Sequence, residues 1–198
     1  MRITDVSKLR GPLGELNDQL FGENGEERLQ EFNLWLKGVT AKLLKHVGDI
    51  VLGSIETFDA SKKFTKANVK VKFYGFGTNF EKNFGTKVEN NVGAETIAVY
   101  RLEESARDPE IMTELGPEKR TIKLAQFYGA IEAQGQGQKG LLRVDGYANI
   151  AYIEDMNRIV WAVCASWDAG DGWDVDADSV VSPDAWSEGF QVLARKSA

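Results

Sequence analysis

The chain has 198 residues, with 24 Lys and Arg against 30 Asp and Glu, and therefore carries a formal net charge of −6. Hydrophobic residues make up 42% of the chain, which is enough for a packed core and excludes a disordered or collagen-like protein. Its single cysteine, Cys164, and single histidine, His46, exclude an internal disulfide and a multi-histidine metal site.

The sequence shows no membrane-directed or export-directed segment. No window approaches the roughly 18 apolar residues of a membrane helix. The first residues, MRITDVSKLRGPLGEL, lack the apolar core of a signal peptide. We therefore expect a cytoplasmic protein without membrane contact.

Residues 1–38 predict a helical hairpin. Pro12 is suited to the first position of a helix over 12–22, because its missing N–H costs nothing there. Asn24 has the character of a capping residue for a second helix, which Gly38 ends. The apolar stripes of the two helices either pack on the rest of the chain or dock a partner.

The middle segment, 39–119, mixes strand and helix patterns. An Asp108–Pro109 pair is typical of a helix start, and Gly116–Pro117 of its end. Alternating apolar and polar residues indicate half-buried strands. The expected elements are a strand starting at Ile50, a strand over 69–73, a helix over 78–84, a strand over 95–102 and a helix from 108.

The C-terminal segment, 120–198, predicts a helix followed by an antiparallel meander. Apolar residues share one face of a helix over 121–134, and the GQGQKG run that follows indicates a flexible exit. Asp145–Gly146 is a hairpin signal. The expected strands are 141–144, 147–154, 159–167, 173–180 and 190–195, with a helical turn over 183–186.

These patterns together predict an α+β protein: a helical hairpin, a mixed middle segment, and a C-terminal helix with an antiparallel meander of about five strands. The only plausible domain boundary is GPEKR at 116–120. The alternative is one continuous domain over 39–198.

The C-terminal run carries a resemblance to a known group. It reads GYANIAYIE, then Trp173-x-Val175-x-Ala177, then Pro183-x-x-Trp186, and closes with Val192-x-x-Arg195. The run resembles the ends of a large group of small, uncharacterised proteins from candidate-phyla bacteria. In that group the last residues read Phe-Ser-Arg-Asn, where this chain has Leu-Ala-Arg-Lys. The resemblance implies a shared fold and a bacterial origin, and it implies no reaction.

Charge is distributed unevenly along the chain. The stretch 60–90 holds seven lysines and two glutamates, net +5, whereas 154–194 holds nine acidic residues and Arg158, net −8. Lysines beside aromatic residues are typical of a single-stranded nucleic-acid groove. Here the aromatic residues recur at strand and helix periods, so we interpret them as core and do not favour nucleic-acid binding. The two segments either face each other in one chain or pair head to tail between copies.

The turn after 167 and the strand that follows it are rich in aspartate and tryptophan. A carboxylate-rich turn could supply several of the six to eight oxygen ligands that calcium prefers, although the EF-hand pattern is absent. Tryptophans could form a platform for a sugar or a peptide, or fill the core. The candidate metal ligands are Asp168, Asp171, Asp174, Asp176 and Asp178, and the candidate ligand-binding residues are Trp167, Trp173 and Trp186.

No constellation of catalytic residues is visible. Cys164 lies in the apolar run VWAVCASW, without a cation nearby in sequence to lower its pKa. Neither glycine-rich stretch has the spacing of a phosphate-binding loop. We therefore predict a non-enzymatic interaction protein, which binds a protein partner or itself through its basic and acidic faces. The alternative is a module for a small ligand, carbohydrate or calcium at 167–178.

Overall fold

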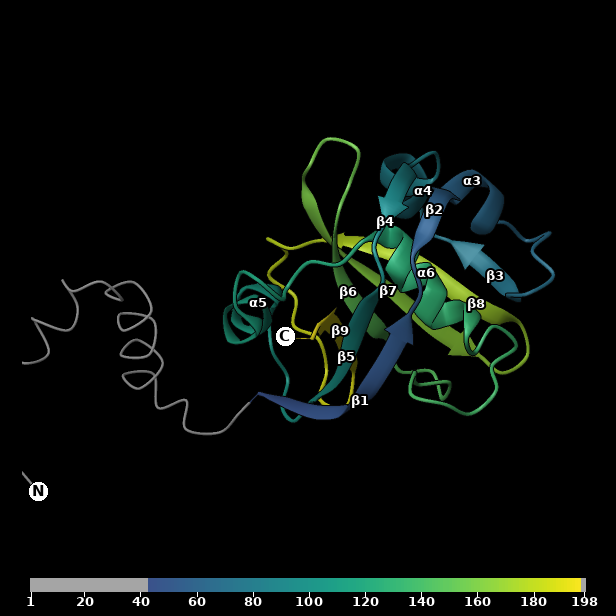
Figure 1. Cartoon of the computed structure of the whole chain (residues 1–198). Helices are drawn as coiled ribbons and strands as arrows, with labels where there is room; N and C mark the ends of the chain where they lie inside the picture. The colour runs from purple at the N-terminus through teal and green to yellow at the C-terminus, as the bar shows by residue number, and fades with distance from the viewer. Residues whose placement is uncertain (1–42, 197–198) are drawn as a thin grey trace, which may run out of the picture. The chain divides into compact units, whose positions relative to one another are not determined.

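A seven-stranded mixed sheet organises residues 43–196, the part of the chain that the computed structural model describes (Figure 1). Its strand order is β1-β5-β9-β6-β7-β8-β3. A separate antiparallel pair consists of β2 (Ile55–Asp59) and β4 (Val88–Val92). The strands of the large sheet are β1 (Leu44–Leu52), β3 (Phe73–Phe76), β5 (Glu95–Leu102), β6 (Asn149–Glu154), β7 (Val160–Asp168), β8 (Gly172–Ser179) and β9 (Gln191–Arg195).

Four short helices accompany the strands in the described part: α3 (Ala60–Lys63), α4 (Thr78–Phe84), α5 (Asp108–Leu115) and α6 (Leu124–Glu132). The sequence predicts α4 correctly through phenylalanines that recur every four residues, and α5 through its start and stop residues. None of these helices has the length and apolar character needed to cross a membrane. The predicted helical hairpin over 1–38 lies outside the described residues.

The predicted α+β class is wrong for the described residues. They are mostly β, with nine strands in two sheets. The predicted five-stranded C-terminal meander is also wrong: β6, β7 and β8 do pair antiparallel in chain order, but β9 does not pair with β8. It lies between β5 and β6 instead, antiparallel to β5 and parallel to β6. Both sequence segments therefore contribute strands to one sheet, and residues 43–196 belong to one structural unit.

Two predicted strands are absent or shortened because side chains form hydrogen bonds with their backbone amides. The amides of Leu142 and Arg143 donate to the side chains of Gln134 and Asn149, at 2.7 and 2.9 Å, so 141–144 stays outside the sheet. The side chain of Asn68 accepts from the amides of residues 70 and 71, which makes a turn. The strand predicted at 69–73 therefore starts only at Phe73.

The predicted helical turn over 183–186 is a strand-like bridge. The amide of Trp186 donates to the carbonyl of Ala106 at 2.8 Å, and the amide of Ala106 donates back at 3.1 Å. This pairing draws the 180–190 segment across the sheet. A sequence window cannot show it, because the two residues are 80 positions apart.

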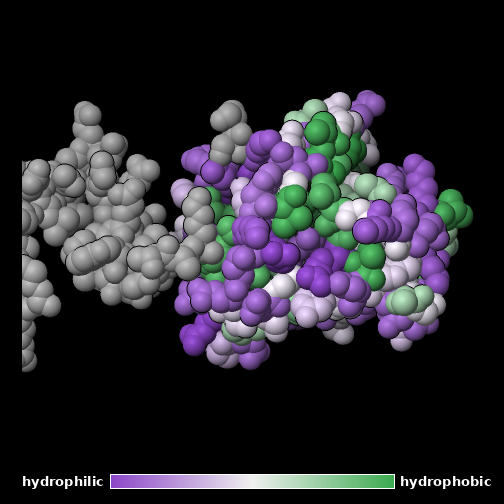
Figure 2. Space-filling view, turned by 90° about the horizontal axis from the view of Figure 1, so that it is seen from below, coloured by the Kyte–Doolittle hydropathy of each residue, from purple (hydrophilic) through white to green (hydrophobic). Residues whose placement is uncertain are grey.

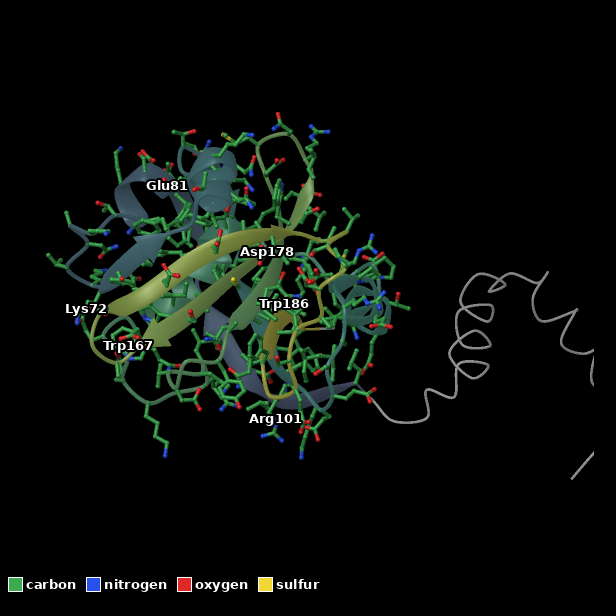
Figure 3. The ribbon with its side chains drawn as sticks, turned by 180° about the vertical axis from the view of Figure 1, so that it is seen from behind. Lys72, Glu81, Arg101, Trp167, Asp178 and Trp186 are labelled. Carbon is green, nitrogen blue, oxygen red and sulfur yellow. The ribbon has the colours of Figure 1, made fainter. Side chains whose placement is uncertain are left out.

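The two faces of the large sheet are covered unequally. One face packs against α6, α3, α4 and the β2–β4 pair, and its core includes Phe58, Phe80, Phe127 and Trp173. On the other face, α5 and the 180–190 segment form a second core with Ile111 and Tyr152. Beyond that core, the ribbons of β7 and β8 have no helix over them (Figure 3).

Candidate functional site on the open face of strands β7 and β8

Three aspartates form a row along β8. Asp174 and Asp178 are exposed and Asp176 is half-buried, whereas Trp173, Val175 and Ala177 are fully buried on the opposite side. This alternation is the one that the sequence predicts for 173–178. The row therefore lies on the α5 side of the sheet, along the part of β8 over which no helix is drawn (Figure 3).

The neighbouring strand presents small side chains to this row. In the antiparallel register of β7 and β8, Ala162 lies opposite Asp178, Cys164 opposite Asp176 and Ser166 opposite Asp174. These side chains are short, but only Cys164 and Ser166 are half-buried, whereas Ala162 is fully buried in the second core. We call these six residues the acidic face.

The carboxylates of the acidic face repel one another. Burial raises the pKa of Asp178, and the negative charges of Asp176, Asp108 and Asp184 raise it further. Burial also raises the pKa of the Cys164 thiol to about 12, and the charges of Asp178, Asp176 and Asp174 add to this effect. This thiol is therefore protonated at neutral pH and is a poor nucleophile.

None of the three aspartates on β8 forms an ion pair with another described residue. The acidic face thus keeps its charge, and the described part of the chain does not neutralise it. Such a concentration of one sign attracts cationic partners and speeds their association.

The two remaining candidate metal ligands have a role in the turn. The Asp168 side chain accepts from the amide of Gly170 at 2.8 Å and from that of Asp171 at 3.2 Å. Nowhere in 43–196 do three His, Cys, Asp or Glu side chains gather closely enough to hold one metal ion. The structure therefore does not bring the five aspartates together as a calcium site.

The structure separates the candidate tryptophans from the aspartates. Trp167 and Trp173 are 8% and 0% exposed, and their rings pack edge to face 5.5 Å apart in the core beneath the sheet. The indole of Trp173 donates to the carbonyl of Gln134 at 3.2 Å. A side chain at Gly137 would clash with the ring of Trp167. These two indoles therefore offer no exposed platform.

Trp186 has a different structural role, which involves a residue that the sequence reasoning used only as a helix start. Its indole donates to Oδ1 of Asp108 at 2.7 Å, and the hydroxyl of Tyr152 donates to the same atom at 2.8 Å. Burial raises the pKa of Asp108, and these two hydrogen bonds oppose the rise. Asp108 thus ties α5, β6 and the 180–190 segment together.

The basic segment 60–90 lies beside the acidic face in the same chain. Its strand β3 pairs in parallel with β8, and the Nζ atom of Lys72 donates to the carbonyl of Gly170 at 3.0 Å. Figure 3 places Lys72 and Glu81 at this edge of the sheet. The basic segment and the acidic face are thus adjacent in one chain, although no ion pair joins a lysine of 60–90 to an acidic residue of 154–194 in the described residues.

A polar hollow of about 570 Å³ lies elsewhere, between β4 and the start of α6. Lys87 and Glu89 form a largely buried ion pair in its wall, with Nζ and Oε1 2.9 Å apart. Arg195 pairs with Glu95 at its rim, at 2.9 Å. Because these charges neutralise each other, the hollow presents no strong field of one sign.

The sequence reasoning found the row on β8 through its alternation. It missed the hollow, Asp108 and the buried Lys87–Glu89 pair, because each needs residues far apart in the chain. Comparison with known proteins gives no assignment: no protein-family model, curated protein or solved structure matches the chain.

Proposed function

We propose that this protein is a non-enzymatic interaction module whose acidic face binds a basic surface of a protein partner. The observation that carries this proposal is the row of three exposed or half-buried aspartates on β8, without an ion-pair partner in residues 43–196. Like charges held together this way cost folding stability, and a cationic partner offsets that cost on binding.

The form of the face supports a protein partner. The short, half-buried side chains of Cys164 and Ser166 lie opposite Asp176 and Asp174, so no bulky neighbour on β7 shields these two carboxylates from a basic segment. On the underside of the domain, hydrophobic residues occur in groups interrupted by hydrophilic ones (Figure 2).

Binding of a fluorescent ten-residue oligolysine tests the proposal. The informative variant replaces Asp174, Asp176 and Asp178 with Asn. Its control replaces Glu56, Glu104 and Glu118 with Gln, which removes the same charge from exposed positions elsewhere. We expect wild type and control to bind with similar Kd, and the Asn variant to bind at least about tenfold more weakly, since each tenfold is only about 1.4 kcal/mol.

Equal weakening by the two triple variants would show that only net charge matters, and the proposal would fail. Circular dichroism confirms that both variants are folded. Raising the salt concentration should weaken binding of the wild type, because salt screens exposed charges.

A second candidate function is self-association, with the basic segment of another copy as the partner. The observation that favours it is the adjacency of β3 and β8 at one edge of the sheet. Two copies related by a two-fold axis could each present lysines to the other's aspartates, which gives a closed dimer. Head-to-tail pairing of copies into a filament would need the basic and acidic surfaces at opposite ends of the molecule, and their adjacency gives it less support.

A further inference from the structure

A hollow of about 380 Å³ lies at the edge of the acidic face, where β3 and α4 meet β8. Tyr74 and Phe76 supply aromatic rings to its lining, and Glu81 and Asp174 supply carboxylates. Asp174 therefore belongs both to the acidic face and to this hollow. Tyr74 is 52% exposed, so its ring is accessible from solvent.

Two glycines keep the hollow open. A side-chain carbon at Gly75 would approach the Asp174 carboxylate to 2.5 Å, and one at Gly77 would overlap the carboxylate of Asp176. The carboxylates of β8 thus lie against bare backbone of β3 and the residue that follows it. Any larger residue at either position would push them away.

One cation of the chain already lies in this hollow. The Nζ atom of Lys66 is 5.9 Å from the centre of the Tyr74 ring, within the range of a cation–π contact. Lys66 lines the hollow but forms no ion pair with Glu81, Asp174 or any other described residue. Its ammonium group is held by an aromatic face alone, next to two carboxylates without an ion-pair partner in the described part.

We infer that the hollow is the recognition pocket for one Lys or Arg side chain of the basic partner, and that Lys66 occupies it in the free protein. This inference rests on the proposed function, since the partner's other cations would bind along the acidic face. The cation enters over the ring of Tyr74, displaces Lys66 and pairs with Asp174 and Glu81. Aromatic rings and carboxylates together suit an organic cation and disfavour an anion such as phosphate.

The first test is Lys66→Ala, measured with the same oligolysine against Lys82→Ala. Lys82 is an exposed residue of α4 that does not line the hollow, so its removal changes net charge equally. We expect Lys66→Ala to bind about two- to fivefold more tightly than Lys82→Ala, because it frees the ring. Equal affinity of the two variants, or weaker binding by Lys66→Ala, overturns the inference.

The second test is Tyr74→Leu, which keeps an apolar side chain and removes the aromatic face. We expect binding about two- to fivefold weaker than wild type. If Tyr74→Leu binds like wild type while the triple Asn variant is weakened, the proposed function stands and the pocket is wrong. If wild type itself does not bind oligolysine, or both triple variants weaken equally, the proposed function fails first.

Discussion

At the scale of single residues, Asp178 is a carboxylate that both burial and neighbouring charges disfavour. Its carboxylate is partly desolvated and faces Asp176, Asp108 and Asp184, and all of these effects raise its pKa. A raised pKa in the folded state means that the protonated form is stabilised relative to the charged form. The contribution of the protonated Asp178 to the free energy of unfolding is fully present below the pKa of the unfolded chain. It is lost as pH rises through the raised pKa of the folded protein.

Asp178→Asn should therefore stabilise the protein at pH 7, because it removes the repelled charge. We expect a gain of only about 0.5 kcal/mol, since solvent screens an exposed carboxylate. The gain should shrink as pH falls towards 4, where the native aspartate takes up a proton. Thermal unfolding at both pH values measures this. Asp171→Asn, on the exposed turn outside the row, should leave the Tm unchanged at either pH. A lower Tm for Asp178→Asn at pH 7 would contradict the assigned repulsion.

At the scale of elements, the first turn of α6 is hydrogen-bonded by a side chain from strand β4. The carboxylate of Glu89 on β4 accepts from the amides of Leu124 and Ala125, at 3.3 and 2.8 Å. It also pairs with Lys87 at 2.9 Å, where the two side chains are only 7% and 12% exposed. The carboxylate of Glu89 thus accepts hydrogen bonds from the free amides at the start of α6 and neutralises the buried ammonium of Lys87.

Removing this carboxylate should be costly. Glu89→Ala leaves two helix amides without their acceptor and the ammonium of Lys87 without its carboxylate, with the carbonyl of Glu154 as its remaining acceptor. We therefore expect a loss of about 3 kcal/mol in the free energy of unfolding. Urea unfolding measures the change. Glu95→Ala breaks the more exposed pair with Arg195 and should cost less than about 1 kcal/mol. Similar losses in the two variants would contradict the role given to Glu89.

At the scale of the whole molecule, the charge pattern allows two kinds of assembly. The basic segment and the acidic face adjoin at the β3–β8 edge, so one copy could bind a foreign basic surface or a second copy. Self-association through these charges must be sensitive to ionic strength, because exposed charges are screened beyond about 10 Å at 0.1 M salt.

Light scattering of the full chain at 20 mM and 500 mM salt should therefore show a dimer that dissociates at the higher concentration, if a second copy is the partner. The triple Asn variant should be monomeric at both concentrations. A monomer at both salt concentrations in the wild type rejects self-association and leaves a foreign basic protein as the partner. A dimer that persists at high salt rejects the charge pairing in the same way.

Sequence patterns by themselves determined the elements whose signals are local. Alternation predicted the two sides of β8, the four-residue recurrence of phenylalanine predicted α4, and start and stop residues predicted α5. All three signals depend on neighbours within a few positions. The same alternation identified the aspartates of the candidate site. What it could not show is which face of β8 lies open, since that depends on where the helices pack.

Only the tertiary structure decided the strand order, the buried tryptophans and the hollow. β9 joins β5 and β6 because the bridge between Ala106 and Trp186 carries the chain across the sheet, and no local pattern encodes that partner. Tyr74, Glu81 and Asp174 meet because β3 pairs with a strand about 100 residues later in the chain. Residue spacing along the chain determines local structure, such as a helix or the two sides of a strand. A binding site is formed by segments that are distant in sequence, and only tertiary packing brings these together.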